Sequence, residues 1–214
     1  MQTIALYTTE TMADWEYAHL TTQIATAEEV RPGRFRLLLV GDGLDPVRSL
    51  GGLPLSPAAD LDELIPLADE GTLAALVVPG GSHYVEGGHE RLAGTVKDLV
   101  ERDIPVAAIC GATYFLARNG FLNERRHTSN AAGFLAASGY RGANRYVDTP
   151  VITDQGITTA SGIHAVPFTA EVMRVTQLAP EPVITTWEQL YLTGEPRCYE
   201  ALMEATSTWQ SSWE

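Results

Sequence analysis

Short apolar runs alternate with amphipathic stretches along most of the chain, and this alternation constrains the fold more than any other feature. Buried strands are predicted from the apolar runs at residues 3–7, 34–41, 73–78 and 105–109. Helices are predicted between them, at residues 14–26 and 90–101, where apolar side chains recur at helical spacing. Apolar strands joined by amphipathic helices are typical of a mostly parallel sheet covered on both faces.

Weaker signals complete the expected order of elements. They predict a short ribbon around residues 51–52, helices at 60–65, 113–118 and 166–178, a β-hairpin around 154–156, and a C-terminal helix in "EPRCYEALMEATSTWQ". The chain has no internal repeat and no linker rich in Pro, Gly or Ser. We therefore expect a single domain over residues 1–214, with 195–214 as a C-terminal helical extension.

The charge balance restricts the partners of the chain. Its 214 residues carry a net charge of −13, and an acidic surface argues against binding to nucleic acid or to an anionic membrane. No signal peptide is evident, and no apolar run reaches the length of about 20 residues that spans a bilayer. Two cysteines, Cys110 and Cys198, do not make a disulfide framework, so a cytoplasmic location is expected.

Cys110 lies where the apolar run at residues 105–109 meets a predicted helix. The first N–H groups of a helix and its dipole stabilise an anion, so a thiol at this corner is expected to ionise more readily than a free one. The alternative is that Cys110 is a small buried hydrophobe without chemistry, as most free cysteines are.

Two glycine segments lie at the ends of neighbouring predicted strands. In an open parallel sheet the reactive crevice lies at the carboxyl ends of the strands, where "VVPGG" and "AAICGA" both stop. Gly80 allows close approach of the backbone, and the amides of Gly81 and Gly111 are the natural pair of donors for an oxyanion. An ordinary tight turn after the strand would also account for Gly80 and Gly81.

An acidic side chain is the second candidate component. Glu16, in "MADWEYA", starts the first predicted helix and can either face water or lie over the strand ends. In the second case it would share a proton with Cys110, and burial beside the thiol would raise its pKa. Asp14 is interpreted as the N-cap of this helix.

The sequence offers more than one candidate histidine as a partner for the thiol. "NERRHTSNAAG" offers His127, and "ASGIHAVPF" offers His164 at a later strand-to-helix connection. The histidines are scattered rather than placed at the spacing of metal ligands, so neither a metal nor another cofactor is expected.

The motifs "MADWEYA", "VVPGG" and "AAICGATYFLARNGFLNERR", in this order, resemble the ThiJ/PfpI (DJ-1-like) family of the class I glutamine amidotransferase-like superfamily. The resemblance runs from Ile4 to about Leu178. It implies a flavodoxin-like three-layer α/β/α sandwich with a strained nucleophile elbow, and a homodimer. By the same resemblance Cys110 is the nucleophile, Glu16 its carboxyl partner, and Gly81 and Gly111 the oxyanion donors.

The chain departs from the family pattern after the elbow helix. Many members read like "RRATTHW" where this chain reads "RRHTSNA", so the family's histidine falls on Asn130, and His127 lies three residues earlier. Asparagine can hydrogen-bond but cannot act as a general base. We prefer Asn130 at the site, with His127 as the alternative.

Two activities of the superfamily are disfavoured. Glutaminases carry a His-x-Glu near the later connection, whereas His164 is followed two residues on by Val166. A protease fits poorly with a small, occluded elbow site.

Three functions remain open. The first is a cysteine-dependent hydrolase, hydratase or glyoxalase-like enzyme on small carbonyl or amide compounds. The second is a redox-responsive stress protein in which an oxidant converts Cys110 to a sulfinic acid. The third is a non-catalytic binding relative. Gly80, His164 and Tyr114 are candidates to line the pocket, but no motif identifies the substrate.

Overall fold

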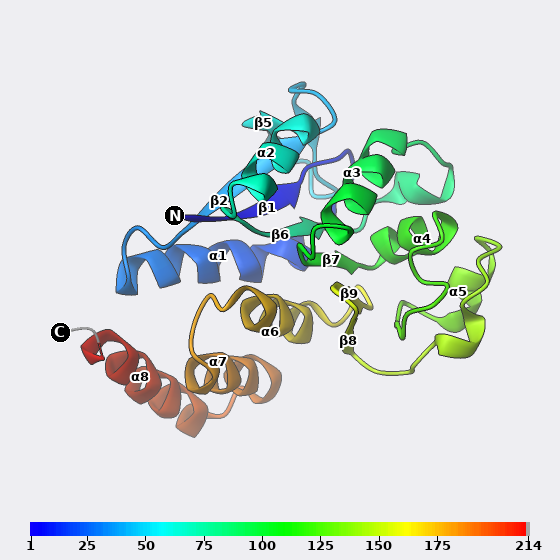
Figure 1. Cartoon of the computed structure of the whole chain (residues 1–214). Coiled ribbons are helices and arrows are strands. Elements are labelled where there is room, and N and C mark those ends of the chain that lie inside the picture. Colours follow the sequence, from blue (N-terminus) through cyan, green and yellow to red (C-terminus); the bar gives the residue numbers. More distant parts are fainter. Residues whose placement is uncertain (213–214) are drawn as a thin grey trace.

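A seven-stranded sheet forms the centre of the computed structural model, which describes residues 1–212 (Figure 1). Its strands are, in spatial order, β5 (Ala59–Asp60), β2 (Phe35–Gly41), β1 (Gln2–Tyr7), β6 (Leu73–Val78), β7 (Val106–Ile109), β9 (Ile157–Ala160) and β8 (Val151–Asp154). Neighbouring strands pair in parallel except β8 and β9, which form an antiparallel hairpin. A separate antiparallel ribbon pairs β3 (Val47–Arg48) with β4 (Pro54–Leu55). The mostly parallel sheet, the hairpin and the ribbon are therefore confirmed.

Helices cover both faces of this sheet. They are α1 (Asp14–Val30), α2 (Leu64–Asp69), α3 (Glu90–Val100), α4 (Gly111–Arg118), α5 (Ala132–Ala136), α6 (Ala165–Thr176), α7 (Glu181–Thr193) and α8 (Pro196–Ser211), with short 3₁₀ turns at Leu61–Glu63, Ser82–Val85 and Ala143–Arg145. Figure 1 shows α1, α6, α7 and α8 on one side of the sheet and α2, α3 and α4 on the other. The buried apolar residues accordingly form two clusters, one on each face. This arrangement is the predicted three-layer α/β/α sandwich.

The first helix differs from its prediction at both ends. It continues to Val30, beyond residue 26, and stops before Pro32. Its N-cap is Ala13, not Asp14, and no side chain caps it. The carboxylate of Asp14 instead accepts a hydrogen bond of 2.7 Å from the N–H of Gly51, which fastens the turn between β3 and β4 to the start of α1. The prediction that Asp14 caps the helix is therefore wrong.

The C-terminal part of the chain contains one helix more than the sequence indicated. A C-terminal helix was predicted and is α8, but α7 was not predicted. Helix α7 packs on α6, and α8 packs on α7 and reaches α1. Residues 213–214 of the predicted extension lie outside the described residues.

The topology gathers several chain segments at one edge of the sheet. Because β1, β6, β7 and β9 are parallel, their carboxyl ends lie side by side. Helix α1 begins a few residues after β1 at this same edge, and α4 begins directly after β7. Side chains from four separate parts of the sequence can therefore meet there.

Candidate active site

Cys110 occupies a strained turn between β7 and α4. Its φ of 58° and ψ of −121° lie in a region that L-residues with a side chain rarely adopt. Hydrogen bonds hold the turn from both sides. The N–H of Cys110 donates to the carbonyl of Ala160 at 3.0 Å, and its own carbonyl accepts from the N–H and hydroxyl of Thr113 at 3.1 and 2.6 Å. The strain is therefore maintained by strand β9 and by the first turn of α4.

Glu16 is fully buried in the first turn of α1 and lies against this elbow. One carboxyl oxygen, Oε2, accepts a 2.6 Å hydrogen bond from the N–H of Gly80. The other, Oε1, has no hydrogen-bond partner in residues 1–212 that meets ordinary geometry. The Glu16 carboxyl is also within interaction range of the Cys110 thiol, and each of these two groups affects the ionisation of the other. A buried carboxyl oxygen is thus available beside the sulfur.

Gly80 and Gly162 enclose the pair formed by Glu16 and Cys110. A Cβ atom added to Gly80 would lie 2.8 Å from both the Cβ of Cys110 and Oε2 of Glu16. A Cβ atom added to Gly162 would lie 2.7 Å from Sγ of Cys110 and 2.9 Å from Oε1 of Glu16. Both positions therefore require glycine. Gly162 was not predicted, although its place just after β9, at the carboxyl edge, was a signal that could have indicated it.

The pKa of the Cys110 thiol differs from the lowered value expected for a thiol at a helix N-terminus, and the pKa of Glu16 is raised as well. Burial raises the pKa of Glu16 to about 7. Burial, and after it the charge of Glu16, raise the pKa of the Cys110 thiol to about 11, although the Asn130 amide and the Gly111 N–H act in the opposite direction. The prediction of a readily ionised thiol is therefore wrong, because desolvation and a neighbouring carboxylate outweigh the helix dipole.

Asn130 reaches the sulfur with its amide nitrogen. Nδ2 lies 3.3 Å from Sγ of Cys110, and Oδ1 accepts a 2.9 Å hydrogen bond from the N–H of Gly162. A backbone N–H can only donate, so this contact requires that the oxygen face Gly162 and that the NH₂ group face the sulfur. Asn130 is thus oriented as a hydrogen-bond donor toward Cys110.

His127 is held away from the thiol by two other hydrogen bonds. Nδ1 lies 2.8 Å from the carbonyl of Arg125 and must donate to it, so Nε2, 3.0 Å from the hydroxyl of Tyr140, is the acceptor of a neutral ring. His127 is fully buried, and this burial lowers its pKa. The structure brings Asn130, and not His127, to Cys110.

Gly81 and Gly111 lie against each other next to the elbow. A Cβ atom added to Gly111 would lie 2.7 Å from the carbonyl oxygen of Gly81 and 3.3 Å from its nitrogen. Gly111 is the first residue of α4, and its N–H interacts with the Cys110 sulfur. The N–H of Gly81 donates no hydrogen bond within residues 1–212. The Gly111 N–H is thus a backbone donor at Sγ, and the N–H of Gly81 belongs to the segment packed against Gly111.

The remaining predicted pocket residues differ in position. His164 precedes α6, two residues after Gly162, and its buried Nδ1 has no hydrogen-bond partner in residues 1–212. Tyr114 is directed elsewhere, since its hydroxyl donates to the carbonyl of Ala137 at 3.2 Å and its ring packs on Phe134. His164 is therefore near the site, whereas Tyr114 supports α5.

Two exposed apolar side chains that the sequence did not single out flank the elbow. Trp15 donates its indole N–H to the carbonyl of Gly162 at 2.9 Å, yet 52% of its surface is exposed. Ile163 is 86% exposed. A ligand at Cys110 would therefore meet apolar surface on this side.

The comparison with known proteins covers the residues of this site. The model of the DJ-1/PfpI family matches residues 2–175, which include the elbow, Glu16, Asn130 and both glycine segments. The chain belongs to the DJ-1/PfpI family.

Individual relatives of this DJ-1/PfpI protein cover almost its whole length. It is 32% identical over 209 residues to the "uncharacterized protease YoaZ" of Bacillus subtilis. The alignment covers 95% of this chain and 98% of the relative. A ThiJ/PfpI family protein from Bacillus anthracis superimposes with a TM-score of 0.83 at 31% identity, over 96% of this chain and 98% of that one. A DJ-1 superfamily protein from Agrobacterium tumefaciens superimposes with a TM-score of 0.77 at 32% identity, over 91% of this chain and 100% of that one.

Residues 1–212 contain neither a cluster of metal ligands nor a helix suited to span a membrane. Within this range, no three His, Cys, Asp or Glu side chains gather as a group that could hold a metal ion. None of the helices in the same range combines the length and the apolar character needed to cross a bilayer.

Proposed function

We propose that this DJ-1/PfpI protein is a cysteine-dependent enzyme in which the Cys110 thiol adds to a small, reactive carbonyl compound, as a glyoxalase-like or hydratase-like activity requires. The observation that carries this proposal is the buried Glu16 carboxyl beside Sγ, with a pKa raised to about 7 and one oxygen without a partner. A carboxyl that titrates near neutral pH can both accept and return a proton under physiological conditions.

The addition step uses groups that already surround the sulfur. Ionised Glu16 takes the proton from the Cys110 thiol while a sulfur electron pair forms the S–C bond, and the π electrons of the carbonyl move to its oxygen. The N–H groups of Gly81 and Gly111 stabilise this oxyanion. Glu16 then returns the proton to the oxygen, which gives a hemithioacetal with no change in oxidation state.

The residues around Cys110 favour addition to a carbonyl over cleavage of a peptide bond. Peptide cleavage also needs an acid for the leaving amine and a base that activates water for deacylation. Asn130 occupies the place of the family's histidine and acts as a donor to the sulfur, and His127 is engaged elsewhere. The protease in the name of the B. subtilis relative is therefore not our proposal for this chain.

Turnover of methylglyoxal and other small 2-oxoaldehydes and aldehydes tests this proposal. We expect activity that Cys110→Ser abolishes and that Glu16→Gln reduces by about a hundredfold or more, since general acid–base catalysis contributes 10²–10⁴-fold. Cys198→Ser, which changes the only other cysteine, is the matched control and should retain activity. If no carbonyl compound in the panel is converted, or if Cys110→Ser remains active, the proposal is wrong.

A redox role is the second candidate, and the donors around the sulfur favour it. The Asn130 amide and the Gly111 N–H point toward Sγ, so they can hydrogen-bond the oxygens of a sulfinate formed there. The oxidant would be hydrogen peroxide, of which two molecules react in turn: the first converts the thiol to a sulfenic acid and the second converts that to the sulfinic acid, each giving one oxygen atom and leaving as water. Mass spectrometry after mild peroxide treatment is the test, and an unmodified Cys110 would exclude this role.

We further propose that the protein is a homodimer, with the carboxyl edge of the sheet as the contact surface. Leu50 and Leu53 are each more than half exposed in the turn that Asp14 fastens to α1, and Trp15 lies on the same helix. Exposed apolar side chains that cluster on a surface are typical of contact sites. Sedimentation equilibrium should give twice the chain mass for the wild type and a lower mass for Leu53→Asp. A monomeric wild type would contradict the proposal.

A further inference from the structure

A cavity of about 280 Å³ lies between the helices α1, α6, α7 and α8. All four helices contribute to its wall, among other residues with Ala27, Met173, Trp187 and Trp209. The model of the DJ-1/PfpI family ends at residue 175, so α7 and α8 lie beyond the part of the chain that it matches. Membership of the family therefore assigns no role to this cavity.

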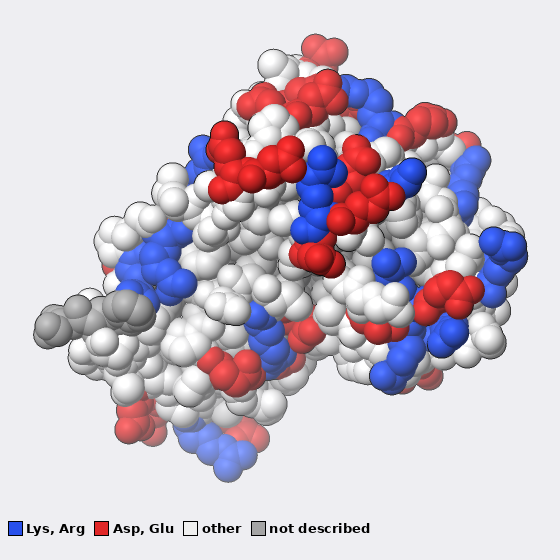
Figure 2. Space-filling model, viewed as in Figure 1, with Lys and Arg blue, Asp and Glu red and all other residues white. Residues whose placement is uncertain are grey.

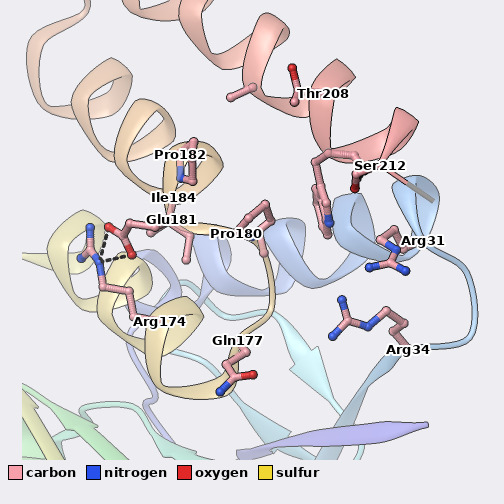
Figure 3. Close-up of a pocket in the computed structure, with 13 residues that line it drawn as sticks. Arg31, Arg34, Arg174, Gln177, Pro180, Glu181, Pro182, Ile184, Thr208 and Ser212 are labelled. Atoms are coloured by element: carbon pink, nitrogen blue, oxygen red, sulfur yellow. Dashed lines mark hydrogen bonds and ion pairs between the residues drawn. The ribbon is translucent and has the colours of Figure 1, made fainter. Parts of the chain in front are cut away.

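The wall of the cavity carries no charge. Among its lining residues, all within residues 1–212, there is no Lys, Arg, His, Asp or Glu. A neighbouring cavity of about 780 Å³ shares Ala179 and Trp209 with it but differs in chemistry, since Figure 3 shows Arg34, Arg174 and Glu181 at its wall. Figure 2 likewise shows acidic and basic side chains distributed over the face of the molecule that it presents. An ionic ligand would thus lose its hydration in the smaller cavity without compensation.

The cavity has a buried floor and an exposed apolar rim. Trp187 and Trp209 are buried, whereas Tyr191, Tyr199 and Met203 are each more than half exposed. The rings of Trp187 and Tyr191 lie 5.0 Å apart, centroid to centroid, at an interplanar angle of 37°. Walls of this kind favour an aromatic ligand, because ring pairs stabilise a complex beyond the apolar area that they bury.

The volume of the cavity limits the size of such a ligand. An engineered apolar cavity of about 150 Å³ in another protein holds one benzene ring. At about 280 Å³, the cavity between α1 and α8 has close to twice this volume. A compound of two fused rings therefore fits it better than a single ring does.

The indole N–H of Trp187 provides a polar contact in this apolar wall. Trp187 is 2% exposed, and its Nε1 atom has no hydrogen-bond partner in residues 1–212. Trp15, by contrast, donates its indole N–H to the carbonyl of Gly162. A buried donor without an acceptor is destabilising, and buried tryptophans usually have an acceptor. An acceptor atom on a ligand in the cavity that Trp187 lines would satisfy this N–H.

We propose that this cavity binds an uncharged aromatic compound of about two rings, with a carbonyl or ether oxygen that accepts a hydrogen bond from Nε1 of Trp187. The cavity includes neither Cys110 nor Glu16, so the proposal is independent of the proposed carbonyl chemistry. It assigns to α7 and α8 a role in ligand binding, since α7 contributes Trp187 and α8 contributes Trp209.

Two probes of the same shape test this proposal on the full chain by isothermal titration calorimetry. 2-Acetylnaphthalene has a carbonyl oxygen, and 2-isopropenylnaphthalene has a methylene group in its place. We expect one saturable site per chain for the ketone, with an affinity about fivefold or more above that of the hydrocarbon, because only the ketone gives the buried N–H an acceptor. 2-Naphthoate, which adds a negative charge to the same rings, should bind more weakly than the ketone. All titrations use a Cys110→Ser chain, so that addition to the thiol contributes nothing.

A substitution of Trp187 tests the hydrogen bond itself. Trp187→Phe keeps an aromatic ring but removes the N–H, so the preference for the ketone should disappear. Trp15→Phe, which removes an indole N–H outside the cavity, is the matched control and should keep the preference. Circular dichroism and the Tm check that each variant is folded. If Trp187→Phe is not, the indole N–H signals in a heteronuclear NMR spectrum replace it: one signal should move downfield with the ketone and stay in place with the hydrocarbon.

Substitutions in α8 test the location of the site. Thr206→Phe places a ring in the cavity wall and should weaken the binding of both naphthalenes about tenfold or more, because the cavity is then overpacked. Ser207→Phe places the same ring at the next, exposed position, which does not line the cavity, and should leave both affinities unchanged.

Equal affinities of the two naphthalenes, a preference for the ketone that Trp187→Phe retains, or binding that Thr206→Phe leaves unaltered would each overturn the proposal. Met203→Asp in the rim separates a ligand from a second copy of the chain. Its mass in sedimentation equilibrium should equal that of the wild type, and a lower mass would overturn the proposal, because a second copy would then cover the cavity. Loss of carbonyl turnover in Cys110→Ser is a separate result, so failure of the proposed function and failure of this site are distinguishable.

Discussion

At the scale of single residues, the proposed chemistry depends on the ionisation of Glu16 and Cys110. After burial, the charge of Glu16 and its hydrogen bond with the thiol are the causes that raise the thiol pKa. We therefore predict that Glu16→Gln lowers the pKa of Cys110 from its value of about 11, by about one unit or more, while turnover falls because the proton acceptor is lost. The pH dependence of the alkylation rate in a Cys198→Ser background measures the pKa. An unchanged or higher pKa in the variant would contradict the proton-sharing pair.

His127 provides a contrasting prediction at the same scale. It joins the Arg125 carbonyl to the Tyr140 hydroxyl in the interior, so His127→Ala leaves both groups without their partner. We expect the free energy of unfolding to fall by about 2 kcal/mol, with the alkylation profile of Cys110 unchanged. Urea unfolding and alkylation are the two measurements. His83→Ala, at an exposed position, is the control. A shifted thiol pKa with unchanged stability would instead support a catalytic role.

At the scale of elements, the turn from β9 to α6 limits the space at the candidate active site. A side chain at Gly162 would lie 2.7 Å from Sγ of Cys110, against the proposed nucleophile. We predict that Gly162→Ala reduces turnover and the alkylation rate about tenfold or more, since small displacements of reacting groups have large effects. Gly94→Ala in α3, where an added Cβ meets nothing within 4 Å, is the matched control. Equal effects of the two substitutions would contradict this role of Gly162.

The same elements show what could be predicted from the sequence. The strands of the sheet were predicted because their apolar runs are buried on both faces, and Glu16, Gly81, Gly111 and Asn130 could then be placed by the meeting of strand ends and by the family motifs. Helix α7 was missed, because Val183, Ile184 and neighbouring threonines have low helix propensity. Its stability comes from burial of Trp187 in the same cluster as Phe168, which only the tertiary structure shows.

Two features of the molecule depend on packing and could not be derived from the pattern of residues. The direction of the Cys110 pKa follows from burial and from the proximity of Glu16, and neither is visible in the sequence. The contact of α8 with α1 joins segments far apart in the chain, and such a contact has no local signal.

At the scale of the whole molecule, the buried carboxyl links the active site to stability. The pKa of Glu16 rises from 4.5 to about 7 on folding, so the folded state favours the protonated form. The stabilisation from this group is complete below pH 4.5 and is lost as the pH rises toward about 7. This pKa difference corresponds to about 3 kcal/mol in the free energy of unfolding. We predict that the wild type loses this stability between pH 4.5 and 7 relative to Glu16→Gln.

Urea unfolding of both proteins at several pH values measures this difference directly. All other titratable groups are common to the two proteins, so subtracting one pH profile from the other isolates Glu16. The difference should favour the variant increasingly as the pH rises, and should level off above about pH 7. A difference that stays constant with pH would mean that Glu16 keeps its ordinary pKa on folding, and the carboxyl could then not return a proton to the oxyanion at neutral pH. Stability and the proposed catalysis therefore depend on the same physical cause, the burial of one carboxyl group beside the sulfur.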